Sequence, residues 1–164
     1  MKTKKVAVIG MLVAVAFVLS YIEAMLPLNI GIPGVKAGLS NIVVVFCMYK
    51  LNVRETFGIA IIRIILCGLT FGSLSAMLYS LSGGILSFII MFILKKTEKF
   101  SVYGVSVAGG VAHNIGQICL AIIILKTELL IYYLPFLLVS GTIAGVIVGI
   151  LSAILIKRLK GLEI

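Results

Sequence analysis

The residue best placed to do chemistry in this sequence is Arg63, which stands alone in an apolar run, residues 56–69. An ionised side chain inside a membrane costs about 2.5–3.5 kcal/mol on insertion scales. Such a residue therefore needs a partner or a function. Either Arg63 pairs structurally with Glu23 or a helix-end carbonyl, or it is a fixed cation that binds an anionic ligand.

A second polar group consists of His113, Asn114 and Gln117, in the apolar run 102–125. His113 and Gln117 are four residues apart, so they share one face of a helix. These three side chains either join helices by hydrogen bonds or orient a bound ligand. Because a lone histidine in a chain with few acids is a poor metal site, we expect no metal.

Other polar side chains are expected on the outer side of the membrane or near its middle. Glu23 closes the first apolar run, Lys36 lies in a segment with Pro and Gly, Asn41 begins the second run, and Ser82 lies near the middle of the fourth. A ligand pocket needs an apolar cavity with few directed polar groups. We predict that these residues join Arg63 and the His113 group in a pocket open to the outside. The alternative is that they face different neighbours.

Composition decides which elements can position these residues. Of 164 residues, 62% are hydrophobic and 12% charged, and mean hydropathy is +1.31, which excludes an ordinary soluble domain of this size. We predict an all-α integral membrane protein with six transmembrane helices in one domain, residues 1–164. The predicted helices are residues 5–24, 38–50, 54–69, 74–95, 102–125 and 133–157.

Positive charge predicts the orientation of these helices, since loops rich in Lys and Arg stay cytoplasmic. Thirteen of the 14 Lys and Arg residues lie outside the spans, eleven on one side and two, Lys36 and Lys126, on the other. Both termini are therefore expected in the cytoplasm. We interpret the net charge of +9 as a topology signal, with a lipid bilayer and no nucleic acid as partner.

Small residues four apart let membrane helices approach closely. Gly141, Gly145 and Gly149 form such a stripe on the last helix, and the first helix has two small-residue pairs. The pairs on the first helix are Gly10 with Ala14, and Ala16 with Ser20. Each stripe either packs inside the bundle or faces a partner membrane protein.

Several kinds of catalytic motif are absent from the sequence. It has no G-x-S-x-G nucleophile motif and no ATP-binding G-x-x-x-x-G-K-[ST] motif. All five acids are glutamate, so the clustered aspartates that hold magnesium diphosphate in prenyl-diphosphate synthases are missing. We therefore expect that this chain is not an enzyme.

Four stretches carry a family resemblance. Residues 32–42 (IPGVKAGLSNI), 71–73 (FGS), 81–87 (LSGGILS) and 109–117 (GGVAHNIGQ) resemble the bacterial heptaprenyl diphosphate synthase component I family, also called the Gx transporter family. The architecture looks like that of the S components of energy-coupling factor transporters, which capture vitamins.

The two family names imply different functions in the bacterial cytoplasmic membrane. The S-component likeness implies a pocket closed by residues 26–36, a docking face on the first helix and an energy-coupling transmembrane subunit with ATPases. The synthase name implies a role in making the isoprenoid tail of menaquinone. The ligand would be vitamin-, flavin-, quinone- or isoprenoid-like, with no cofactor bound covalently.

Three functions therefore stay open. The first is an S-component-like binding or transport protein for a small anionic or amphipathic solute. The second is a non-catalytic membrane component of heptaprenyl diphosphate or menaquinone biosynthesis. The third is a structural subunit of a membrane redox complex.

Overall fold

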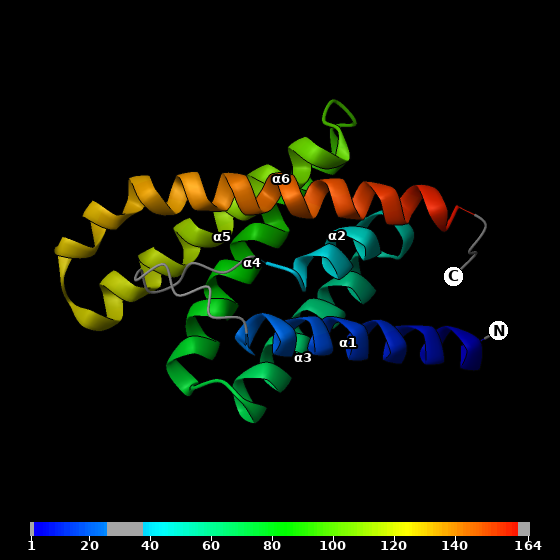
Figure 1. Ribbon diagram of the computed structural model, residues 1–164, viewed down its shortest axis with the longest axis horizontal. Coiled ribbons are helices and arrows are strands. Elements are labelled where there is room, and N and C mark those ends of the chain that lie inside the picture. The colour runs from blue at the N-terminus through cyan, green and yellow to red at the C-terminus, as the bar shows by residue number, and fades with distance from the viewer. Residues whose placement is uncertain (1, 26–37, 161–164) are drawn as a thin grey trace.

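The described chain is built from helices. The computed structural model describes residues 2–25 and 38–160, and within these ranges it has helices, turns and no strand. The all-α prediction is confirmed, and each predicted helix has a counterpart whose bounds differ by three residues or fewer. In chain order the elements are α1 (Lys2–Met25), α2 (Asn41–Lys50), α3 (Val53–Thr70), α4 (Leu74–Lys96), α5 (Val102–Leu125), the 3-10 helix η1 (Glu128–Tyr133) and α6 (Leu134–Arg158) (Figure 1).

Not all of these helices could cross a membrane alone. Four segments in the described ranges are long and apolar enough: α1, α4, α5, and η1 together with α6. α3 has 18 residues but includes Arg54, Glu55 and Arg63. α2 has 10 residues, about 15 Å of helix, or half of a hydrocarbon core about 30 Å thick. A multi-pass membrane protein fits these lengths, and the count of six spans stays a prediction.

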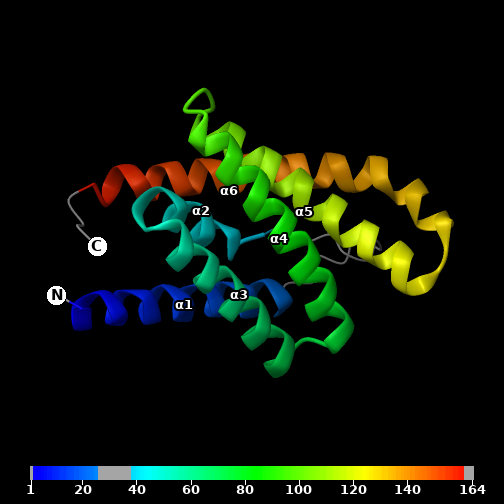
Figure 2. The same cartoon turned by 180° about the vertical axis from the view of Figure 1, so that it is seen from behind.

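The helices pack around α2 and α5. α5 contacts α4 and α6 extensively, whereas α1 contacts mainly α3 and α2. Both views show α2 between α1 and α6 (Figures 1 and 2). α1 is therefore the most peripheral of the long helices, and most of its surface is exposed.

α2 is enclosed by its neighbours on every side, since all residues from Ile42 to Met48 are buried. Gly38, just before it, has φ of +73°, a conformation that glycine adopts without strain. A Cβ added at Gly38 would lie 3.7 Å from Val148 Cγ2, near the middle of α6. The Ser152 hydroxyl donates to the Ile42 carbonyl at 3.2 Å. α2 therefore runs beside the second half of α6 and begins near the midpoint of that helix.

The glycine stripe of α6 packs inside the chain, against α5. A Cβ at Gly145 would lie 2.6 Å from Val107 Cα, and one at Gly149 would lie 3.1 Å from Tyr103 Cα. Gly141 is equally close to the Gly110 backbone. Small residues at these positions let the two backbones approach, so internal packing is the role the structure shows for this stripe.

The small residues of α1 divide between two faces. Ala16 is fully buried, and Ser20 accepts a hydrogen bond within the bundle. Gly10 and Ala14 are exposed, and a Cβ at Gly10 would meet nothing within 4 Å. The Gly10–Ala14 face is therefore open to lipid or to a partner protein.

Positively charged helix ends meet at one end of the molecule, which we call the basic end. Lys5 Nζ lies 2.8 Å from Glu55 Oε1, which joins α1 to α3. Lys50 Nζ donates to the Lys160 carbonyl at 3.4 Å, and Lys95 Nζ donates to a backbone carbonyl near the end of α2. These contacts bring together helix ends that the sequence assigns to one side. Which end faces the cytoplasm stays a prediction.

The glycine contacts generate a matched pair of variants. Gly145→Leu should destabilise the protein because the new side chain collides with the α5 backbone, and overpacking typically costs about 1–3 kcal/mol. Gly10→Leu should leave stability unchanged because its Cβ meets open space. Thermal unfolding of both purified variants in nanodiscs measures the difference. Equal melting temperatures for the two would contradict the α5–α6 packing.

Candidate functional site

A polar cluster surrounds Arg63 where α1, α3 and the start of α2 meet. Arg63 Nη1 donates to the Ser40 hydroxyl and, at 3.4 Å, to the Ser20 hydroxyl. Nη2 lies 3.5 Å from Asn41 Oδ1. Since α2 begins opposite the middle of α6, the guanidinium lies deep in the helical bundle rather than at either end.

Glu23 completes this cluster from the last turn of α1. Its Oε1 accepts the Gly38 N–H at 2.6 Å, and its Oε2 accepts the Leu39 N–H at 3.2 Å. The carboxylate therefore binds the backbone of the turn that leads into α2, at the helix end where the dipole favours negative charge. It forms no recorded ion pair with Arg63 among the described residues, where the recorded pair is Lys5–Glu55. The structural pairing of Arg63 with Glu23 is thus indirect.

One donor of the guanidinium has no partner among the described residues. Arg63 Nε is buried, and no described group accepts its N–H. The acceptors of Nη1 and Nη2 are neutral hydroxyl and amide oxygens, which make weaker bonds to a cation than a carboxylate or phosphate does. An unmet donor in a buried site usually costs free energy. Among the described residues, the Arg63 Nε–H is therefore a donor that no side chain or backbone group uses.

His113 and Gln117 lie on the face of α5 that meets α4. A Cβ at Gly83 would lie 2.8 Å from Gln117 Cγ and 3.2 Å from His113 Cδ2. A Cβ at the next position, Gly84, would lie 2.8 Å from Cδ1 of Ile64, the neighbour of Arg63 on α3. α4 is thus in contact with α5 through one glycine and with α3 through the other. That His113 and Gln117 share a pocket with Arg63 stays a prediction.

Asn114 and Ser82 make hydrogen bonds between helices. Asn114 Nδ2 donates to the Leu137 carbonyl at 2.6 Å and lies 3.4 Å from Ser140 Oγ, which joins α5 to α6. Ser82 Oγ donates to the Gly116 carbonyl at 2.8 Å, which joins α4 to α5. These contacts match the interhelical alternative that the sequence left open.

The predicted site residues are therefore only partly brought together. Arg63, Asn41 and Glu23 lie in one cluster, and Lys36 is outside the described residues. Sequence reasoning assigned Ser20 to packing and overlooked Ser40, although both hydroxyls contact Arg63. Their positions in the sequence indicate this role, since Ser20 lies one turn before Glu23 and Ser40 directly precedes Asn41.

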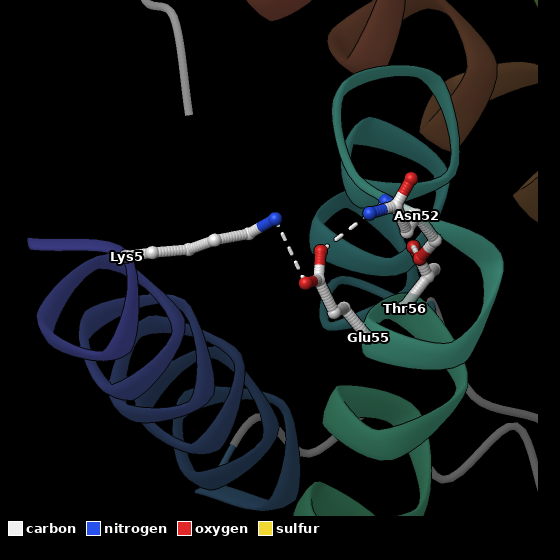
Figure 3. Close-up of polar contacts among 4 residues, drawn as sticks. All are labelled: Lys5, Asn52, Glu55 and Thr56. Atoms are coloured by element: carbon white, nitrogen blue, oxygen red, sulfur yellow. Dashed lines mark hydrogen bonds and ion pairs between the residues drawn. The ribbon is translucent and has the colours of Figure 1, made fainter. Parts of the chain in front are cut away.

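A separate polar contact is found at the basic end (Figure 3). Glu55 Oε2 accepts the Asn52 N–H at 3.3 Å while Oε1 pairs with Lys5, and the Thr56 hydroxyl donates to the Asn52 carbonyl at 3.0 Å. A hollow of about 520 Å³ borders this turn, lined by residues 52–55. These contacts cap α3 and fasten α1 to it, away from Arg63.

Comparison with known proteins gives one family. The sequence model described as heptaprenyl diphosphate synthase component I matches residues 12–155. No curated protein and no solved structure matches. The matched range includes every described residue of the Arg63 cluster.

The Asn114 contact predicts a stability effect. Asn114→Ala should lower the unfolding free energy by roughly 0.6–1.7 kcal/mol, the range measured for hydrogen bonds between membrane helices. Thr142→Ala is the control because its hydroxyl bonds the Leu138 carbonyl of the same helix on an exposed face. Thermal unfolding in nanodiscs compares them. An Asn114 variant as stable as the control would overturn the interhelical role.

Proposed function

The chain belongs to the heptaprenyl diphosphate synthase component I family, and from this premise we propose that it is a membrane-embedded binding protein for a small organic anion. The solute enters from the outer side of a bacterial cytoplasmic membrane, as in S components of energy-coupling factor transporters. It is vitamin- or cofactor-like, with an apolar body and an anionic group. The protein has no catalytic role of its own in this proposal.

The Arg63 cluster is the observation that supports this function. A guanidinium deep in a helical bundle has hydroxyl and amide partners and one unmet donor. Discontinuous helices in membrane transporters direct their N-termini at anionic groups of a substrate near the bilayer midplane. α2, about half the length of a span and beginning near the midpoint of α6, has the same features.

In this proposal the protein has six transmembrane helices, with both termini in the cytoplasm. The sequence predicts eleven cationic residues on the side of the basic end, and cytoplasmic loops are the ones enriched in Lys and Arg. α2 and α3 are the other two of the six proposed spans, and they pack among the four longer helices. The Arg63 cluster then lies between the basic end and the outer surface.

Transport would need a partner, because the sequence has no ATP-binding motif. The exposed Gly10–Ala14 face of α1 suits the close approach of another membrane helix. A transmembrane subunit that carries ATPases is the partner we propose for it. Gly10→Leu, which leaves the fold intact, should then abolish co-purification of that partner.

The family description favours a second function, a non-catalytic membrane component of heptaprenyl diphosphate or menaquinone biosynthesis. A structural subunit of a membrane redox complex is the third. Pull-down of the wild type compared with Gly10→Leu separates these functions. ATPase subunits lost on substitution support transport, prenyl synthases support the second function, and redox subunits support the third.

The central prediction concerns ligand occupancy. Native mass spectrometry of the wild type should show a bound organic anion that Arg63→Ala has lost. Removing one partner of a buried, hydrogen-bonded charge pair costs about 2–5 kcal/mol, or roughly thirtyfold or more in affinity. Arg54→Ala is the matched control, since it removes the same charge from an exposed position of α3.

Two outcomes would contradict the binding function. One is a wild type that retains no anion in native mass spectrometry and is not stabilised by any anion in a thermal-shift panel. The other is a bound anion retained equally by Arg63→Ala and Arg54→Ala. A loss confined to Arg63→Ala supports it.

A further inference from the structure

The start of α2 already holds a carboxylate, and it belongs to the chain itself. Glu23 contacts two successive backbone amides, with 2.6 Å from Oε1 to Gly38 N and 3.2 Å from Oε2 to Leu39 N. Each carboxylate oxygen thus has its own donor. Gly38 and Leu39 belong to the turn that leads into α2, and the first amides of α2 itself are bonded to the Gly38, Leu39 and Ser40 carbonyls. The two amides of this turn, together with the dipole of the helix that follows, form an anion-binding site.

A second observation, independent of the helix end, also indicates that an anion binds here. The guanidinium of Arg63 reaches the same turn through Ser40 and Asn41, yet its buried Nε donates to no described group. Arginine has five donors in a planar arrangement that matches the two oxygens of a carboxylate. Glu23 is directed to the amides instead, so the cluster has more donors than this one side chain satisfies.

We propose that this cluster is a carboxylate-binding site. Glu23 occupies the site when no ligand is bound and is displaced when the carboxylate group of a ligand binds. This inference rests on the proposed function and narrows the anionic solute to a carboxylic acid. Glu23 is then a competitor of the ligand rather than one of its binding residues. Displacement also frees the end of α1 from the start of α2.

The charge of the cluster favours a carboxylate over a phosphate. Arg63 is the cation recorded in it among the described residues, so a monoanion leaves the site neutral once Glu23 has moved away. A phosphate group with two negative charges would leave excess negative charge in a low-dielectric interior, which is costly. The amide spacing that fits Glu23 also fits any other carboxylate.

The alternative is that Glu23 is only a structural cap for α2, and chemical rescue separates the two. Glu23→Ala removes the carboxylate and leaves a space at the Gly38 and Leu39 amides, whereas Glu23→Gln keeps the space filled by a neutral amide. Both variants and the wild type are melted in nanodiscs. The additions are sodium acetate or propionate, with sodium chloride and sodium phosphate at equal ionic strength.

The carboxylate site predicts that acetate or propionate restores at least half of the melting temperature lost in Glu23→Ala. Chloride and phosphate should not, and Glu23→Gln and the wild type should respond little. Rescue should disappear in the double variant Glu23→Ala, Arg63→Ala. Equal rescue by phosphate would overturn the carboxylate class, and no rescue by any anion would overturn the site.

Ligand affinity gives a second measurement that a structural cap would not move. If Glu23 fills the site nine-tenths of the time, removing it should tighten binding of the co-purified anion roughly tenfold. One outcome would overturn the displacement of Glu23 and leave the proposed function standing. In that outcome Glu23→Ala binds the anion no more tightly than the wild type does, while Arg63→Ala still loses it. Loss of the Arg63 dependence itself defeats the proposed function.

Discussion

A positive charge inside the helical bundle, that of Arg63, governs the arrangement of the segments around it. Arg63 lies on α3 at the level where α2 begins, and the groups that solvate it come from α1 and α2. Because an unsolvated cation in a membrane costs several kcal/mol, the guanidinium stabilises the meeting of these three segments. The Glu23 contacts between α1 and the start of α2 and the Lys5–Glu55 pair between α1 and α3 act in the same direction.

The other helices supply the enclosure around this polar cluster. Glycines bring the α5 and α6 backbones into contact at Gly141, Gly145 and Gly149, and Gly83 and Gly84 fit α4 against α5 and α3. Such contacts replace the hydrophobic effect, which does not drive association between helices in lipid. α1 stands apart from this packing, with an exposed small-residue face, and Glu23 ties its far end to α2. The cluster and the partner surface proposed for α1 are thus physically connected.

Hydropathy and charge were sufficient to predict the helices, because a run of apolar residues closed by Lys or Arg leaves few other conformations in lipid. They also identified Arg63, the single charge inside an apolar run, and Asn41 and Glu23 near it. The partners of Asn114 and Ser82 could not be predicted, since both bond to backbone carbonyls of other helices, which no residue type marks. Ser40 was missed for a similar reason, because its role depends on where Gly38 turns the chain into α2.

The Arg63 charge should attract anions to the start of α2, and thiol chemistry measures this attraction directly. Asn41→Cys, in a variant that lacks Cys47, Cys67 and Cys119, is reacted in nanodiscs with anionic and cationic thiosulfonates of similar size. We predict faster modification by the anionic reagent, and loss of that preference when Arg63 is also replaced by alanine. Faster modification by the cationic reagent, or a preference that survives the loss of Arg63, would contradict the account.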